Sequence, residues 1–457
     1  MNAQLTLIDS LADLPKNFRK DKFKSFGESF VYNGEEEVIL FLGADKKRIT
    51  EEDIRFLGGK ARNEAEENFI ENLAVNFNSL MDMSSEFTEK EVAVNFLEGW
   101  YLAGYRFDKY KQDKKKYDSQ LSLPDESYER HRQTAMMRAE AVNIARDLCN
   151  EPANKLTPQI YSEKLDAIFK DSKVEIEIIE AADLRQAGFH AVHLVGKGSG
   201  NSPKVAILKF NNGEGSPVAL IGKGVTFDSG GTNTKTGGDI AEMKMDMGGS
   251  AAVVGAVKLL ADLDCPVNLV AIIPLVVNVA GGEAYLPSDV ITYQNGKTVE
   301  VGNTDAEGRL ILADSILYAQ AIGAENIIDI ATLTGSIGHA LGLKVAGVFC
   351  SDENRLWELK TLGEKSGDYI WPMPLVEDYQ SLLESDTADL NNMSSSAFGG
   401  AITAALFLKN FVGERCKWIH IDMANTVRPW KKEGYYGSGA SGFGVRLLAE
   451  IVQQERK

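Results

Sequence analysis

The chain has 457 residues and a formal net charge of −17. Its length exceeds that of one ordinary domain and predicts two domains. The negative charge argues against nonspecific binding to nucleic acid or to an acidic membrane, because both need local positive charge. Hydrophobic residues make up 44% and charged residues 25%, which is usual for a globular protein in water.

None of the four cysteines belongs to a CxxC pair, which is typical of reduced thiols in a cytosolic protein. These residues are Cys149, Cys265, Cys350 and Cys416. The first residues, MNAQLTLIDSLADLP, lack a basic segment followed by an apolar core, so no secretory signal is expected. The most apolar stretch, 267–280, contains Pro274 and two asparagines and is too short to span a bilayer. We therefore expect a cytoplasmic protein with no membrane partner.

Residues 1–125 are predicted to form a smaller α/β domain. The run VILFLG at 38–43 is apolar and ends in glycine, as a buried strand does, and helical spacing occupies 63–81 and 90–104. The charged run at 109–128 mixes lysine with aspartate. That mixture favours a solvated connection over a basic interaction patch.

One long helix is predicted over residues 127–149, because Pro152 then stops it. We interpret 126–152 as a linking helix and 153–457 as a second, larger domain. Apolar strands and helices alternate in this domain. Strands are expected at 174–179, 205–210, 218–222, 267–277, 327–333, 345–350 and 418–424, and helices at 159–170, 249–262, 307–321 and 400–411.

Such alternation predicts an α/β fold with a mainly parallel or mixed central sheet flanked by helices. Ligands of these folds bind beyond the carboxyl ends of the strands. Lys223 follows the strand expected at 218–222, and Thr332 lies at the end of the strand expected at 327–333. The sequence therefore predicts a site near these two residues.

The segment NTDAEGRL, residues 303–310, has two interpretations. Thr304 and Glu307 have the spacing of a capping box that starts a helix. That interpretation leaves Asp305 and Arg309 without a role. From this segment alone, a helix start and a functional site are equally open.

The segments KGVTFDSGG, 223–231, and MKMDMGGSAA, 243–252, set Asp228 and Asp246 among glycines, with Lys235 between them. Glycines let the backbone fold sharply around a ligand. The GKG sequence is not a P-loop, because GxxxxGK[ST] is not matched. A nucleotide-binding protein would also leave the carboxylates unexplained.

Four carboxylates fall in these segments: Asp228, Asp246, Asp305 and Glu307. In one cleft they would repel one another and take up protons. Two divalent cations would balance them and depress the pKa of Lys223, whose neutral nitrogen could then be a ligand. Histidine offers little, because the one close pair, His190 and His193, is expected in a strand with its rings on opposite faces.

These motifs resemble those of the leucyl aminopeptidases, the M17 family of cytosolic metallo-aminopeptidases. The resemblance covers about residues 140–450 and includes GKGVTFDSGG, MKMDMGGSAA and NTDAEGRLILAD in that order. It continues through DIATLTG at 329–335, GGAITAALFL at 399–408 and SGFGVRLL at 441–448, and NEPANKLTP at 150–158 resembles the entry to the family's catalytic domain. Residues 1–120 match loosely, as the family's N-terminal domain varies.

The resemblance implies roles for ten residues. Metal ligands would be Lys223, Asp228, Asp246, Asp305 and Glu307, with Asp228 and Glu307 bridging two ions. Asp305 and Glu307 would complete the more exchangeable site, and Lys223 and Asp246 the tighter one. Lys235 and Arg309 would be catalytic without binding metal. The pocket for the N-terminal side chain would be lined by Met243, Thr332 and Gly335.

The resemblance also implies an enzyme that releases N-terminal amino acids from peptides, leucine and other bulky apolar residues above all. The two ions, zinc or manganese with magnesium or cobalt as alternatives, would lower the pKa of a water. The free α-amine would bind one ion, and Lys235 would hold the developing oxyanion. A bicarbonate on Arg309 would act as general base, and the enzyme would be a homohexamer.

The chain departs from the family pattern at Thr236, usually proline, at GTNT in 231–234, usually more apolar, and at Asn425, often glycine. These departures put side-chain preference and loop rigidity in question. A DNA-binding or regulatory protein on the same fold is the alternative, since some family members bind DNA. The net charge of −17 and the lack of a basic stripe argue against it.

Overall fold

The computed structural model describes residues 1–8, 26–33, 38–44, 49–83, 86–114, 119–238 and 240–455. Contacts divide the chain into two compact units. The first comprises residues 1–143, 365–367 and 431–438, and the second comprises 144–364, 368–430 and 439–457. The first unit thus takes in two short segments from late in the sequence. The predicted boundaries at 125 and 152 stay predictions.

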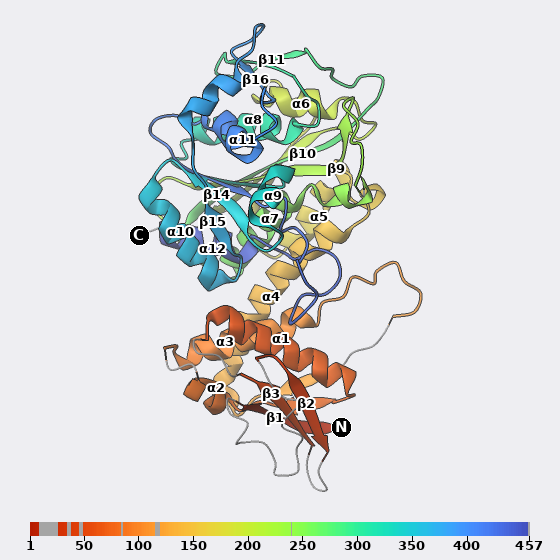
Figure 1. Ribbon diagram of the computed structural model, residues 1–457, viewed down its shortest axis with the longest axis vertical. Helices are drawn as coiled ribbons and strands as arrows, with labels where there is room; N and C mark the ends of the chain where they lie inside the picture. The colour runs from red at the N-terminus through yellow and green to blue at the C-terminus, as the bar shows by residue number, and fades with distance from the viewer. Residues whose placement is uncertain are drawn as a thin grey trace. The chain divides into compact units, whose positions relative to one another are not determined.

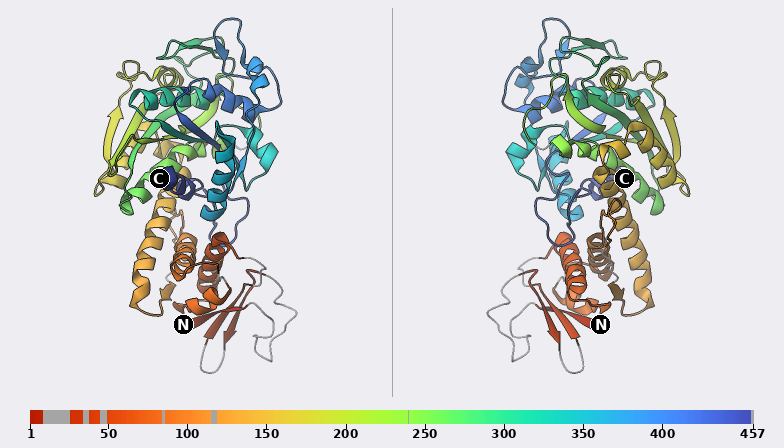
Figure 2. Two further views of the ribbon diagram at one scale, coloured as in Figure 1. Left: turned by 90° about the vertical axis from the view of Figure 1, so that its left-hand side faces the viewer. Right: turned by 90° about the vertical axis from the view of Figure 1, so that its right-hand side faces the viewer.

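The described part of the first unit contains a five-stranded sheet with the strand order β2-β3-β1-β4-β5. The β2–β3 pair is antiparallel and the other pairs are parallel. The strands are β1 (Asn2–Ile8), β2 (Ser29–Asn33), β3 (Val38–Gly43), β4 (Asn72–Ala74) and β5 (Gln120–Ser122), and the helices are α1 (Glu51–Glu67), α2 (Phe77–Met83) and α3 (Glu89–Ala103). Helices α1 and α3 pack against each other and enclose an apolar core with the sheet (Figures 1 and 2).

The helix expected over 63–81 is wrong. Helix α1 begins earlier, because Thr50 and Asp53 form a capping box, and it ends at Glu67. Phe69 then has a φ of 56°, a left-handed conformation that a helix cannot continue through. Strand β4 and helix α2 follow. The apolar spacing of the sequence runs across this break and conceals it.

The described part of the second unit contains a nine-stranded mixed sheet. Its strand order is β15-β14-β17-β13-β8-β10-β7-β6, and β9 also pairs with β10. The strands are β6 (Glu175–Ile179), β7 (Lys204–Asn211), β8 (Val218–Gly222), β9 (Gly224–Gly231), β10 (Asn268–Val279), β13 (Asn326–Ala331), β14 (Ala346–Cys350), β15 (Ile370–Pro372) and β17 (Lys417–Asp422). A separate small sheet joins β11 (Val290–Thr292), β12 (Thr298–Glu300) and β16 (Leu390–Asn391).

Helices cover both faces of the large sheet. One face carries α6 (His190–Gly196), α8 (Glu307–Ala321) and α11 (Gly400–Lys409), and the other carries α5 (Pro158–Phe169), α7 (Gly248–Asp262) and α12 (Val445–Glu455) (Figure 1). The remaining helices are α4 (Glu129–Asn150), α9 (Gly335–Leu341) and α10 (Glu353–Ser366). The prediction of an α/β fold with a mixed central sheet flanked by helices is confirmed. In the described residues we find no helix with the length and apolarity that a membrane crossing requires.

Strand β10 changes partner halfway along its length. It pairs with β8 over Leu269–Ile272 and with β9 over Leu275–Val279, and Pro274 lies at the changeover, where its missing N–H costs little. A Cβ on Gly224 would lie 2.4 Å from Pro274 O, so β9 can approach β10 closely only with glycine there. Both strands run parallel to β10, and Lys223 is the single residue between them.

The stretch FDSGG, whose glycines were expected to let the backbone fold sharply, belongs to strand β9. One further prediction is corrected. His190 and His193 were expected in a strand, but both lie on α6, three residues apart on one helical face. This helix begins where Val192 N donates to Asp314 Oδ2 of α8, at 2.9 Å. That partner is 122 residues away in the chain, so the sequence pattern could not reveal it.

Candidate metal centre

Lys223 is buried at the carboxyl end of β8. Its Nζ lies 2.8 Å from Asp246 Oδ2 and 2.9 Å from Glu307 Oε1, and it donates to Thr332 O at 2.9 Å. Its backbone is also fixed, because Lys223 N donates to Ile330 O and Lys223 O accepts from Ser250 N. Parallel strands β8 and β13 end at the same sheet edge, which brings Lys223 and Thr332 together.

Lys235 lies in the loop that follows β9 and joins two other carboxylates. Its Nζ lies 2.8 Å from Asp228 Oδ2 and 2.5 Å from Asp305 Oδ1. Asp228 Oδ1 accepts from Gly230 N at 2.9 Å, where Gly230 has a φ of 90° that favours glycine. In the described part of the chain, ligand atoms of Asp228, Asp305 and Glu307 all lie within 4.8 Å of one another.

Burial and crowding perturb these carboxyl groups. Burial, followed by the charge of Asp228, raises the pKa of Glu307 to about 8. Burial also raises the pKa of Asp246 to about 6 and moves the pKa of Asp305 upward. Two ammonium groups balance only part of this charge, so the cluster holds an excess of negative charge in a buried place. Such a site takes up either protons or cations.

The two lysines are both charged in the absence of metal. Burial by itself would lower the pKa of Lys223, but the charges of Asp246, Glu307 and Asp228 outweigh it and raise the pKa. The pKa of Lys235 is raised in the same way, mainly by Asp228. Lys223 was expected to be neutral only when two dications are bound. Because Lys223 is charged without metal, metal binding would have to displace a proton from its Nζ.

The donor set of this cluster fits divalent cations. Carboxylate oxygens and one amine nitrogen, without thiolate, suit zinc, manganese, magnesium or cobalt. The clustered oxygens already lie within reach of a shared ion. The structure therefore brings together the five residues that the resemblance implies as ligands, and their roles as ligands remain a proposal.

The segment NTDAEGRL is not a capping box. Helix α8 begins at Glu307, and its N-cap, Ala306, offers no side-chain hydrogen bond. Thr304 instead donates its hydroxyl to Gly230 O at 2.6 Å and accepts from Asn233 N at 2.8 Å. Thr304 N in turn donates to Asn233 Oδ1 at 2.9 Å. The segment thus ties the end of β9 to the start of α8, and Asn233, one of the departures from the family pattern, supplies two of the bonds.

Arg309 lies on α8 and is buried without touching the carboxylates. Its Nη1 donates to Asn392 O at 2.8 Å, and its Nε has no hydrogen-bond partner among the residues that the structure describes. Burial lowers the pKa of Arg309 to about 10, which still leaves the guanidinium charged at neutral pH. A buried cation with an unused donor suits a small anion.

The three residues predicted for the substrate pocket lie in different settings. Thr332 Oγ1 donates to Asp246 Oδ1 at 2.8 Å, so it belongs to the cluster. Met243 is half-buried in the short 3₁₀ helix Ile240–Met245, two residues before the end of that helix. Gly335 begins α9, which Thr334 caps.

Sequence reasoning missed two buried asparagines. Asn278 Nδ2 lies 2.8 Å from Asp228 Oδ1, and Asn392 accepts from Gly302 N and Asn303 N at 2.8 and 3.1 Å. Asn392 Nδ2 also donates to Asn303 O at 2.8 Å. The one signal available was that Asn278 interrupts an apolar strand. Asn425, another departure, is structural, because its Nδ2 donates to Val345 O at 2.8 Å.

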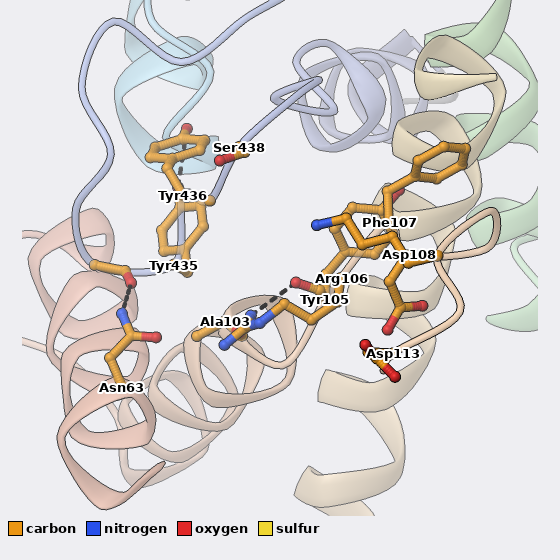
Figure 3. A pocket seen from close by; sticks show the side chains of 13 residues that line it. Asn63, Ala103, Tyr105, Arg106, Phe107, Asp108, Asp113, Tyr435, Tyr436 and Ser438 are labelled. Atoms are coloured by element: carbon orange, nitrogen blue, oxygen red, sulfur yellow. Dashed lines mark hydrogen bonds between the residues drawn. The ribbon is translucent and has the colours of Figure 1, made fainter. Parts of the chain in front are cut away.

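A separate cavity of about 460 Å³ lies in the first unit (Figure 3). Its walls come from the end of α3, the loop after it and residues 434–438, and Asn63 Nδ2 donates to Gly434 O at 2.6 Å beside it. Asp108 also lines it, together with Lys111 and Asp113 from the charged run. None of the predicted site residues does.

Comparison with known proteins finds a family of aminopeptidases. The model "Cytosol aminopeptidase family, catalytic domain" matches residues 143–449, and "Cytosol aminopeptidase family, N-terminal domain" matches residues 29–114. A "Probable cytosol aminopeptidase" of Rickettsia felis is 37% identical over 438 residues, covering 93% of this chain and 87% of its own. One of the same name from Alkaliphilus oremlandii is 38% identical over 431 residues, covering 92% and 85%.

The solved structure of "Bottromycin maturation enzyme BotP in complex with Mn" matches with a TM-score of 0.91 and 30% identity over 100% of both chains. The names of these relatives describe enzymes, which does not favour the DNA-binding alternative. The matched catalytic-domain model covers residues 143–449, which include the residues of the carboxylate cluster. The chain therefore belongs to the cytosol aminopeptidase family, whose members are metal-dependent hydrolases that remove residues from the ends of peptides.

Proposed function

We propose that this chain is a dinuclear aminopeptidase that releases N-terminal residues from peptides and prefers leucine and other bulky apolar side chains. The observation that supports it is the convergence of Lys223, Asp228, Asp246, Asp305 and Glu307. Two dications would balance the four carboxylates and leave Lys223 free to be neutral. Zinc or manganese is proposed, with magnesium or cobalt as alternatives.

When bound, the ions would activate a water molecule and polarise the scissile carbonyl. Asp228 and Glu307 would be shared by the two ions, Asp305 and Glu307 would complete the more exchangeable position, and Lys223 and Asp246 would complete the tighter one. The ammonium of Lys235 keeps its proton and donates a hydrogen bond to the carbonyl oxygen as that oxygen becomes negative. Oxygen from water adds to the carbonyl carbon, the C–N bond breaks, and the leaving amine takes up a proton.

Arg309 is proposed to hold a bicarbonate, which would supply the general base for the attacking water. Its buried guanidinium and unused Nε support this role. Met243, Thr332 and Gly335 are proposed to line the pocket for the N-terminal side chain. A homohexamer in the cytoplasm is proposed on the family resemblance, and light scattering of the purified protein tests the hexamer.

The test is metal content together with hydrolysis of a panel of aminoacyl-amides. We expect about two ions per chain, with Leu-amide among the best substrates. N-acetyl-Leu-amide is the matched control, because it differs only in its blocked amine, and we expect it to be hydrolysed very poorly. Equal turnover of the two amides would contradict the aminopeptidase mechanism. A protein that binds no divalent metal would contradict the dinuclear site.

A further inference from the structure

Asn278 lies at the carboxyl end of β10 and is completely buried. It is the register partner of Asp228 on the parallel strand β9, and the pairing becomes irregular directly after it. Partners in register on parallel strands present their side chains to the same face of a sheet. The amide of Asn278 is therefore held beside the carboxylate of Asp228 by the strands themselves.

The Nδ2 of Asn278 faces three acceptors. It lies 2.8 Å from Asp228 Oδ1, 2.9 Å from Thr304 O and 3.4 Å from Glu307 Oε2. The Oδ1 of Asn278 has no hydrogen-bond partner in the described part of the chain. It lies close to the backbone of Gly231, where an added Cβ would be 2.8 Å away. Turning the amide over would aim its oxygen at three acceptors, so the donor orientation is the only one that satisfies them.

Asn278 contacts one oxygen of each of two carboxylates. Asp228 uses Oδ1 for Asn278 and Oδ2 for Lys235, while Glu307 uses Oε2 for Asn278 and Oε1 for Lys223. Each carboxylate thus keeps one oxygen on the neutral amide and turns the other toward a cation. A neutral donor can do this without occupying a place that a metal ion would need.

Among the described neutral side chains at the cluster, Thr332 and Asn392 do not join two carboxylates. Thr332 Oγ1 contacts Asp246 and, in the described residues, neither Asp228 nor Glu307. Asn392 contacts backbone atoms of Gly302, Asn303 and Ala306. Asn278 differs from both because it contacts the two carboxylates that are proposed to bridge the ions.

We propose that Asn278 is a positioning residue that orients Asp228 and Glu307 together and thereby sets the affinity of both metal positions at once. This inference rests on the proposed dinuclear site. Partners that orient metal ligands typically change affinity about 10–100-fold when they are replaced. Loss of the amide should leave both carboxylates free to rotate and should weaken both binding steps.

The experiment compares Asn278→Leu and Asn278→Ser with the wild-type full-length protein after chelation. Leucine keeps the side-chain volume without a donor, and serine keeps a hydroxyl that is too short to reach both carboxylates. Mn²⁺ titrations by calorimetry give the two binding steps, and the visible spectrum of the Co²⁺-loaded protein reports the coordination geometry. We expect both steps to weaken about 10–100-fold and the Co²⁺ bands to shift.

Two matched variants separate positioning from general damage. Thr332→Val removes a contact to Asp246 alone, so we expect it to weaken only the tighter step. Asn95→Ser removes a buried amide in the first unit, whose Nδ2 donates to Glu91 O at 2.8 Å, and should leave Mn²⁺ binding and the Co²⁺ spectrum unchanged.

The outcomes are distinguishable. Wild-type protein that binds no Mn²⁺ would contradict the proposed function itself. Wild-type binding in two steps, with Asn278 variants that bind equally well or lose only one step, would overturn the positioning role. Failure of both variants to fold would also overturn it, because a residue that only orients ligands should be dispensable for folding.

Discussion

The ammonium of Lys235 lies 2.5 Å from Asp305 Oδ1 and only 24% of the side chain is exposed, although its neighbours in the loop are open to solvent. A lysine that served only as a surface charge would extend into solvent, whereas the ammonium of Lys235 contacts two carboxylates of the cluster. The proposed role, donation to the carbonyl oxygen of a bound peptide, needs this inward placement.

For Lys235→Ala we expect a folded protein that still binds both metals, because Lys235 is not among the proposed ligands. Turnover of Leu-amide should fall about 10²–10³-fold, the usual cost of losing one oxyanion donor. The measurements are metal content and kcat. Lys173→Ala is the control, since Lys173 is 66% exposed and pairs with Asp264 at the surface. Near-wild-type turnover in Lys235→Ala would show that the residue has no catalytic role.

Lys223→Ala should behave differently, because Lys223 is a proposed ligand. Its Nζ contacts Asp246 and Glu307, so the variant loses a donor and leaves buried carboxylates without their cation. We expect metal occupancy and the free energy of unfolding to fall together, since bound metal stabilises the folded state. Metal analysis after dialysis and urea unfolding measure both. Full occupancy in this variant would remove Lys223 from the ligand set.

Gly308→Ala tests how closely α8 approaches Lys223. A Cβ at position 308 would lie 2.8 Å from Lys223 Cε and 2.9 Å from its Nζ. Alanine favours a helix over glycine by about 1 kcal/mol, so helix propensity alone predicts a more stable protein. We expect metal affinity to fall nonetheless, because the lysine must move. A calorimetric Mn²⁺ titration that matches wild type would show that the site tolerates the methyl group.

His420→Leu tests a buried ion pair between the neighbouring strands β13 and β17. His420 Nδ1 lies 2.5 Å from Asp329 Oδ1, and Trp418 Nε1 donates to Asp329 Oδ2 at 2.7 Å. Burial by itself would lower the pKa of His420, but Asp329, and then Asp422, outweigh burial and the opposing charge of Arg309 and raise it. The pair should stabilise the fold fully below about pH 6.5, the ordinary value, and lose this contribution as the pH rises through the folded pKa.

Removal of the imidazole leaves Asp329 buried with fewer partners, so we expect His420→Leu to cost about 3–5 kcal/mol below pH 6.5. The measurement is the urea midpoint of chelated protein across about pH 6–9. Wild type should lose stability toward the alkaline end more steeply than the variant. Parallel curves would mean that His420 is neutral throughout this range.

Much of this protein follows from residue patterns along the chain. Alternating apolar strands and helices predicted the second unit's sheet, because a parallel strand is buried on both faces and must be apolar throughout. The ends of the strands expected at 218–222 and 327–333 predicted where Lys223 and Thr332 would meet. The two carboxylate segments predicted metal, because repulsion among four acids needs cations to relieve it.

Only the tertiary structure decided the rest. Thr304 and Glu307 have the spacing of a capping box, yet Thr304 bonds instead to Gly230 and Asn233, 74 and 71 residues away. His190 and His193 are helical because Asp314 accepts from the backbone of α6. In the sequence, Asn278 is one polar residue in an apolar strand, and only the pairing of β9 with β10 places Asp228 beside it. Hydrogen-bond donors have no periodicity of their own, so their partners are chosen by strand register and helix packing, which the sequence does not display locally.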